Sequence, residues 1–263
     1  MARERTLILL ICLLTSLDCP RLMACRPSRT CSYEYFQSSL VIAGNQVTVE
    51  FYKPSGAGTS PLVLMLHGSS GAFSTDGNSE PAKDNFGEKQ LARSCFAVAL
   101  PHYMEALGRK SILTVQEMSE RFPEMVSALQ EILNRVEALP WIDARQVFLY
   151  GESLGGYLGF ALTLERPEIA AISEFSGGLP SGYRLLPRRR LKALISHGSS
   201  DTVVPLSEAD KVAVFCREHG ISVTMQIFKG QGHFLSPAAR QQVVNRTLRF
   251  FCEKDYQRMH APR

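Results

Sequence analysis

The sequence has 263 residues, of which 45% are hydrophobic and 21% are charged, a composition typical of a globular protein with one large domain or two small ones. The formal net charge is +4, but residues 1–30 alone carry five arginines against two acidic residues. The rest of the chain therefore carries a net charge of only +1, which does not indicate a nucleic-acid partner.

The first 24 residues are predicted to be a signal peptide or another targeting segment. A basic start, MARER, precedes an apolar run of 12 residues from Thr6 to Leu17, which is too short to span a bilayer but suits the core of a signal peptide. This basic-then-apolar pattern predicts a periplasmic, secreted or lipid-anchored protein, and the residues LMAC at 22–25 loosely resemble a bacterial lipoprotein processing box. Membrane contact is expected only through this segment. The alternative is a cytoplasmic protein with an uncleaved tail, or with Met23 as its true start.

The seven cysteines do not indicate whether the protein resides in an oxidising or a reducing compartment. Cys25 and Cys31 could form a disulfide in an exported protein. Cys95, Cys216 and Cys252 fall within or at the ends of predicted helices, where buried thiols pack as small hydrophobic groups. No CxxC motif or Cys/His cluster has zinc spacing, so no metal site is expected.

The predicted elements begin with a hairpin and continue as buried strands and helices. The β-rich runs SSLVIAG and QVTVEFY are separated by Gly44-Asn45, a hairpin signal. The almost wholly apolar run at 61–66 predicts a strand buried on both faces of a parallel sheet. A loop rich in Gly and Ser, a helix over 84–95 and a strand over 96–100 follow.

The second half of the chain alternates between helix and strand. Apolar positions at helical spacing predict a helix over 123–139, with Pro123 in its first turn, where proline is tolerated. The later elements are strands over 146–150, 170–175, 191–196 and 221–228, and helices ending at Glu165, His219 and about Cys252.

This order favours one α/β domain over residues 39–255, preceded by an extension at 25–38 and followed by a tail at 256–263. The sheet is expected to be mostly parallel, with helices on both faces. About 14 residues separate the strands at 170–175 and 191–196, so the lid is expected to be small or absent.

Ligands of such sheets bind at the carboxyl ends of the strands. The segment GESLG at 151–155 follows one strand and opens a helix, which fits the G-x-S-x-G nucleophile elbow. In this turn a strained backbone lifts the serine hydroxyl clear of the sheet, and glycines let helix and strand pack closely. Ser153 is therefore the candidate nucleophile.

A serine hydroxyl needs a base within hydrogen-bond reach, and the base needs a group that orients it. His233 follows the strand at 221–228 after a glycine-rich turn, and Asp201 lies in the loop after the strand at 191–196. We expect His233 to act as the base and Asp201 to hold its tautomer. His67 and His197 also follow strands and are expected to be structural.

The transition state of acyl transfer needs donors for the developing oxyanion. We expect these donors to be the backbone N–H of Leu154, the residue after the nucleophile, and that of Ser69 in the loop HGSSG. Tyr103, just after the strand at 96–100, is a candidate substrate contact; the alternative is a half-buried aromatic residue at the rim.

The body of the chain, from about residue 39 to 252, resembles the α/β-hydrolase superfamily and within it the dienelactone hydrolase family. The resemblance implies an eight-stranded sheet and hydrolysis through an acyl-enzyme, with Ser153, Asp201 and His233 as the triad. The segments that carry it are DNFGEKQLARSCFAVALPHYMEALG, GESLGGYLG, EFSGGLP, HGSSDTVVP and GQGHF.

The chain departs from the best-known dienelactone hydrolases, which use cysteine at the elbow. They also carry a glutamate where this chain has Gly68, and an arginine that grips the substrate carboxylate and has no counterpart in PHYMEALG. Serine relatives act on simple esters, so the predicted function is a carboxylesterase that needs no cofactor and acts on a small-molecule ester. The alternatives are a serine peptidase resembling the prolyl-oligopeptidase hydrolase domain, and a non-catalytic ligand-binding homologue.

Overall fold

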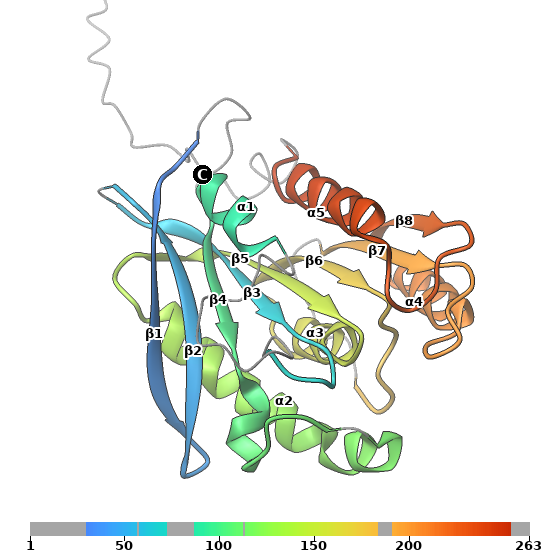
Figure 1. Cartoon of the computed structure of the whole chain (residues 1–263), viewed down its shortest axis with the longest axis horizontal. Helices are drawn as coiled ribbons and strands as arrows, with labels where there is room; N and C mark the ends of the chain where they lie inside the picture. Colours follow the sequence, from blue (N-terminus) through green and yellow to red (C-terminus); the bar gives the residue numbers. More distant parts are fainter. Residues whose placement is uncertain (1–29, 57, 73–86, 113, 184–190, 254–263) are drawn as a thin grey trace, which may run out of the picture.

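The computed structural model describes residues 30–56, 58–72, 87–112, 114–183 and 191–253 (Figure 1). An eight-stranded sheet runs through the molecule in the order β1-β2-β4-β3-β5-β6-β7-β8. The predicted targeting segment at 1–24 and tail at 256–263 lie outside the described residues. Residues 184–190, on which the expected size of the lid partly depends, also lie outside the described residues. The strands are β1 (Tyr33–Ile42), β2 (Asn45–Pro54), β3 (Ser60–Leu66), β4 (Ala97–Pro101), β5 (Ile142–Glu152), β6 (Ile169–Phe175), β7 (Lys192–Gly198) and β8 (Ser222–Phe228).

β1 and β2 form the predicted antiparallel hairpin at one edge of the sheet. Its two-residue turn is Ala43-Gly44, one residue earlier than expected, and both residues have positive φ (49° and 81°). A turn with positive φ at both central positions matches the twist of paired strands. β1 also starts at Tyr33, so part of the segment predicted as an extension belongs to the sheet.

β3 to β8 are parallel to one another, as predicted. All seven residues of β6 are buried, as are six of the seven residues of β3, because helices cover both faces of the central strands. The carboxyl ends of β5, β7 and β8 therefore meet along one edge of the sheet, where the candidate residues of the site were expected.

The helices divide between the two faces, as Figure 1 shows. α2, α3 and α4 pack on one face, and α1 and α5 pack on the other. Their bounds are α1 (Glu88–Arg93), α2 (Val115–Glu137), α3 (Leu154–Glu165), α4 (Leu206–Glu218) and α5 (Pro237–Phe251), and the short 3-10 helix η1 spans Tyr103–Leu107.

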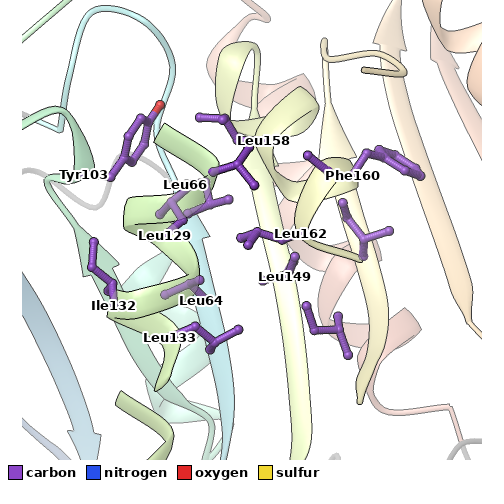
Figure 2. Packing of buried hydrophobic residues seen from close by; sticks show 14 of the residues in the cluster. Leu64, Leu66, Tyr103, Leu129, Ile132, Leu133, Leu149, Leu158, Phe160 and Leu162 are labelled. Carbon is purple, nitrogen blue, oxygen red and sulfur yellow. The ribbon is translucent and has the colours of Figure 1, made fainter. Parts of the chain in front are cut away.

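The larger core lies between the sheet and the layer formed by α2 and α3. In Figure 2, Leu129 and Ile132 of α2 and Leu158 of α3 gather over Leu64 and Leu66 of β3. These side chains are at most 2% exposed. This packing holds α3, the helix that follows the candidate nucleophile Ser153, against the centre of the sheet.

α2 begins eight residues before the predicted start. Thr114 caps it, accepting a hydrogen bond from the backbone N–H of Glu117 at 3.2 Å, and Pro123 lies inside the helix rather than in its first turn. Thr114 and Glu117 have the spacing of a capping box, a signal that outweighed the proline. No helix among the described residues is long and apolar enough to cross a bilayer.

The cysteines do not pair as expected. Cys31 forms a disulfide with Cys95, with the Cα atoms 5.3 Å apart, so Cys95 is not a free thiol. The backbone N–H of Cys31 also donates to Arg93 O, which brings the start of β1 beside the end of α1. Cys252 is also disulfide-bonded, whereas Cys216 is a buried free thiol, as predicted.

Candidate active site

Ser153 stands alone between the last residue of β5 and the first residue of α3. Its backbone lies at φ 54° and ψ −118°, a strained conformation that residues with side chains rarely adopt. The N–H of Ser153 donates to Phe175 O at 2.9 Å, which ties the turn to the end of β6. The expected sharp elbow between strand and helix is therefore present.

The glycines of the elbow are required by close backbone packing. A Cβ atom on Gly151 would lie 2.3 Å from Gly155 O, and a Cβ on Gly155 would lie 2.1 Å from Leu66 O. Neither position has room for a side chain because the obstructing atoms belong to the backbone. The reason predicted for these glycines is confirmed.

The structure brings Ser153, His233 and Asp201 together from the ends of three strands. His233 Nε2 lies 3.0 Å from Ser153 Oγ, and His233 Nδ1 lies 2.8 Å from Asp201 Oδ2. In a neutral imidazole whose Nδ1–H donates to the carboxylate, Nε2 is left free to accept the serine proton. The tautomer of His233 is thus set by Asp201.

Asp201 is itself held by its own loop. Its Oδ1 accepts hydrogen bonds from Val203 N–H and Val204 N–H, both at 2.9 Å. Burial raises the pKa of Asp201, but the hydrogen bonds from Val204, His233 and Val203 outweigh it, so the pKa lies below its ordinary value. The carboxylate is therefore ionised at neutral pH.

His197 lies on the far side of this loop. Its Nε2–H donates to Val204 O at 2.9 Å and stands 3.4 Å from Asp201 Oδ2, and the side chain is fully buried. These contacts fit the structural role expected of His197, because they fix the loop that carries Asp201.

His67 and Tyr103 form a buried stacked pair beneath the loop that follows β3. Their ring centroids are 4.2 Å apart, and Tyr103 donates its hydroxyl to His67 O at 2.8 Å. Burial lowers the pKa of His67 to about 3, so the imidazole stays neutral. Tyr103 has no exposed surface, so the expectation that it contacts substrate needs correction; its hydroxyl is already bound to the backbone.

The two amides predicted to form the oxyanion hole flank the nucleophile. Leu154 is the first residue of α3, and Ser69 lies in the loop after β3. Within the described ranges, no hydrogen bond engages the N–H of either residue. A Cβ atom on Gly68 would lie 3.4 Å from Ser153 Cβ, which shows how closely this loop approaches the nucleophile.

Apolar side chains stand exposed next to the base and its partner. Phe234 is 76% exposed and its ring lies 5.2 Å from that of His233, while Val203, two residues after Asp201, is 64% exposed. Glu152, beside the nucleophile, is instead buried. Burial raises its pKa, and the charges of Arg240 and His233 oppose that rise.

The segment at 174–177 contacts both the elbow and the loop that carries His233; it belongs to EFSGGLP, one of the segments that carry the resemblance, but no site residue was predicted in it. Ser176 has φ 50° and its hydroxyl donates to His233 O at 3.4 Å. Glu174 is fully buried one residue before the carbonyl that accepts from Ser153. The sequence signals for this segment are the motif EFSGGLP and a carboxylate within the apolar strand AAISEF.

A family model described as phospholipase/carboxylesterase matches residues 55–247, well over half of the chain. The chain belongs to the phospholipase/carboxylesterase family. The residues matched run from the start of the parallel sheet into α5, so they include the elbow and both loops that carry Asp201 and His233.

Curated relatives of this family member are distant and include proteins described as inactive. Inactive dipeptidyl peptidase 10 of mouse (Mus musculus) is 21% identical over 56% of this chain and 22% of its own length. Two rice proteins (Oryza sativa subsp. japonica) named probable carboxylesterase and probable inactive carboxylesterase are 29% and 28% identical, over 45% and 42% of this chain. The chain spans between a fifth and a half of the length of these relatives.

Solved structures share the fold at low identity. A dienelactone hydrolase-like promiscuous phosphotriesterase from metagenomic libraries has a TM-score of 0.68 and 16% identity, covering 84% of this chain and 98% of its own. The dienelactone hydrolase of Anabaena variabilis has a TM-score of 0.60 and 19% identity, covering 84% and 97%. The acylaminoacyl peptidase of Pyrococcus horikoshii has a TM-score of 0.62 and 17% identity, covering 86% and 42%. The predicted α/β-hydrolase fold of the dienelactone hydrolase type is confirmed, and the family to which the chain belongs is one of hydrolases.

Proposed function

We propose that the protein is a serine esterase that cleaves a carboxylic ester through an acyl-enzyme. Ser153 is the nucleophile, His233 the general base, and Asp201 the group that orients and stabilises the imidazolium. The observation that carries the proposal is the hydrogen-bonded chain from Ser153 Oγ through His233 to Asp201, with Ser153 held in a strained elbow.

In the acylation step Ser153 Oγ attacks the ester carbonyl carbon while His233 Nε2 takes the hydroxyl proton. The N–H groups of Leu154 and Ser69 stabilise the negative charge that develops on the carbonyl oxygen. The C–O bond of the ester then breaks, and His233 gives the proton to the departing alcohol.

Deacylation repeats these roles with water as the nucleophile. His233 takes a proton from the water that attacks the acyl-enzyme, and the proton returns to Ser153 as the acid leaves. The ionised Asp201 stabilises the imidazolium in both steps. No cofactor takes part in this sequence.

A substitution of Ser153 tests the proposal directly. Ser153→Ala should abolish hydrolysis of short-chain aryl esters, whereas Ser207→Ala, which removes an exposed hydroxyl on α4, should leave the rate unchanged. Activity of Ser153→Ala within a few-fold of wild type would contradict the proposal.

Two other functions are motivated by the relatives. Similarity to a dipeptidyl peptidase and the fold of an acylaminoacyl peptidase suggest a serine peptidase, and the relatives described as inactive suggest a ligand-binding protein without catalysis. A fluorophosphonate probe distinguishes the second case, because it labels Ser153 only if the hydroxyl is activated. An ester requirement is rejected if a peptide anilide is cleaved as fast as the esters.

The exposed Phe234 and Val203 next to the triad favour substrates with an apolar group beside the scissile bond. A panel of aryl esters of graded acyl length measures this preference. kcat/KM should rise as the acyl chain lengthens from acetate, since each buried CH₂ contributes about 0.8 kcal/mol. A constant or falling kcat/KM along the series would argue against an apolar subsite.

We also propose that the protein is exported. The Cys31–Cys95 disulfide supports this proposal, because structural disulfides form and persist mainly in oxidising compartments. Fractionation of cells that express the full chain, with a periplasmic and a cytoplasmic marker enzyme, tests it. Recovery of the protein with the cytoplasmic marker would count against export.

A further inference from the structure

Glu174 is a buried carboxyl group for which the mechanism above has no use. It lies at the carboxyl end of β6 and has no exposed surface. Its Oε2 accepts the backbone N–H of Gly177 at 2.8 Å, while Oε1 has no hydrogen-bond partner among the described residues. A carboxylate in such surroundings would normally be paired on both oxygens.

The carboxyl group lies against the first turn of the nucleophile helix. A Cβ atom on Gly156 of α3 would lie 2.9 Å from Glu174 Oε2 and equally close to Gly177 Cα. A Cβ on Gly177 would lie 2.4 Å from the same oxygen. Two glycines, Gly156 on α3 and Gly177 just after β6, are thus needed to seat this carboxyl between α3 and the end of β6.

The turn that Glu174 holds contacts both reacting groups of the proposed triad. Phe175 O accepts the N–H of Ser153 at 2.9 Å, and the Ser176 hydroxyl donates to His233 O at 3.4 Å. The bond from Gly177 N–H to Glu174 closes this turn. A shift of the turn would therefore move the nucleophile and the base relative to each other.

We propose that Glu174 is a positioning residue that supports the Ser153–His233 pair as an uncharged carboxylic acid, and that its ionisation slows hydrolysis. The proposal rests on the function proposed above. A negative charge at this point would oppose the oxyanion that forms beside Leu154, because both lie at the N-terminal end of α3. It would also leave an unpaired charge in an apolar site and draw water into the turn.

Among the described residues, no positive charge beside Glu174 favours its ionised form. Burial raises its pKa to about 8, and the hydrogen bond from the Gly177 N–H acts in the opposite direction. Tyr157 on α3 and Cys216 on α4 face it; burial, with the charge of Glu174 among the other causes, raises the pKa of both, that of Cys216 to about 12. The neighbours of Glu174 on β5 and β7 are Gly151 and Ile195, which carry no charge.

Steady-state kinetics of two variants over a pH range test the proposal. Glu174→Gln keeps the shape of the neutral acid and an oxygen for Gly177, so its kcat at pH 7 should stay within about twofold of wild type. Wild-type kcat should fall by about tenfold between pH 7 and 9.5, while that of Glu174→Gln should stay flat. Glu174→Ala should lower kcat by at least about tenfold at pH 7, with KM within about twofold, because the pair is misplaced but the substrate surface is intact.

Asp143→Asn provides the matched control. It exchanges a buried carboxyl for an amide at the opposite end of β5, about 30 Å from Ser153 along the strand, and should reproduce the wild-type pH profile. Circular dichroism at each pH shows whether every variant is folded. If Glu174→Ala does not fold, the pH profile of kcat for Glu174→Gln still tests the proposal.

An alkaline fall in Glu174→Gln equal to that of wild type, or a kcat of folded Glu174→Ala equal to that of wild type, would overturn the proposal. Both outcomes leave the loss of activity in Ser153→Ala untouched. The rate of fluorophosphonate labelling, measured in parallel, reports the reactivity of Ser153 without ester hydrolysis by solvent at high pH. It should follow the same profiles.

Discussion

The hydroxyl of Tyr103 shows how a residue at the end of a strand can serve the site without facing the substrate. It donates to His67 O, and the Tyr103 ring stacks on the ring of His67. His67 is followed directly by the loop that carries Ser69. Tyr103 therefore helps to hold the loop whose Ser69 N–H is one of the proposed oxyanion donors. Its effect on catalysis should appear in kcat rather than in KM.

Tyr103→Phe is expected to lower kcat for an aryl ester several-fold and the free energy of unfolding by about 1 to 3 kcal/mol, because a buried carbonyl loses its donor. KM should not change. Tyr35→Phe, which removes a hydroxyl bonded to Glu50 on the hairpin, is the control and should leave kcat intact. A raised KM with unchanged kcat would restore the substrate contact first expected of Tyr103.

The proximity of Ser153, His233 and Asp201 could be predicted from sequence because each residue follows a strand of a parallel sheet, and such strand ends converge. The positions of Ser153, Asp201 and His233 could be predicted without knowledge of side-chain packing. The roles of Tyr103 and Glu174 could not, because the direction of a side chain at a strand end depends on the neighbours it meets. The glycines that make room for Glu174 are Gly156 in α3 and Gly177 just after β6, and the sequence does not show that they meet.

Among the elements, the start of β1 is joined to the turn between α1 and β4 by the Cys31–Cys95 disulfide. The cross-link spans 64 residues and lies at the end of the sheet opposite the site. Closing a loop of this length in the unfolded chain stabilises the fold by up to about 4 kcal/mol. It should have little influence on the positions of Ser153 and His233.

The double variant Cys31→Ser/Cys95→Ser should accordingly lose about 2 to 4 kcal/mol of unfolding free energy in urea, with kcat unchanged at 25 °C. Cys216→Ala, which alters a buried free thiol on α4, controls for the loss of thiol packing. Unchanged stability of the double variant would show that β1 does not depend on the cross-link. A large fall in kcat would show that the hairpin influences the site.

The existence and type of most elements followed from apolar patterning, whereas their ends depended on local caps and on distant contacts. Thr114 and Glu117 marked the true start of α2 in the sequence, but the proline nine residues into the helix obscured it. β1 extends back to Tyr33 because the segment pairs with β2 and is joined to Cys95. The hairpin was predicted locally, but the Cys31–Cys95 cross-link joins residues 64 positions apart, which the local sequence does not indicate.

At the scale of the whole molecule, the strand order confirms the predicted class, and helices on both faces bury the central parallel strands. This burial has a consequence for stability, because it encloses two titratable groups near the site. His67 lies at the end of β3 and Glu174 near the end of β6, and both are at most 1% exposed. Each favours its uncharged form.

The two groups predict opposite limbs of a stability profile. The folded-state pKa of His67 is lowered to about 3. The contribution of His67 to the unfolding free energy is therefore complete above about pH 6.5 and is lost as pH falls towards 3. The folded-state pKa of Glu174 is raised to about 8, so its contribution is present below about pH 4.5 and is lost as pH rises to 8. Between about pH 4.5 and 6.5 the two slopes oppose each other, which places the maximum of their joint contribution there.

Urea unfolding of wild type and Glu174→Gln from pH 4 to 9 measures the alkaline limb. The unfolding free energy of wild type should decline relative to that of the variant by up to about 1.4 kcal/mol per pH unit between pH 5 and 8, and the difference should then level off. An amide cannot ionise, so the variant should lack this decline. If the two curves run parallel over this range, Glu174 is either ionised in the folded protein at neutral pH or reached by water. Either case would contradict the inference that Glu174 is an enclosed neutral acid.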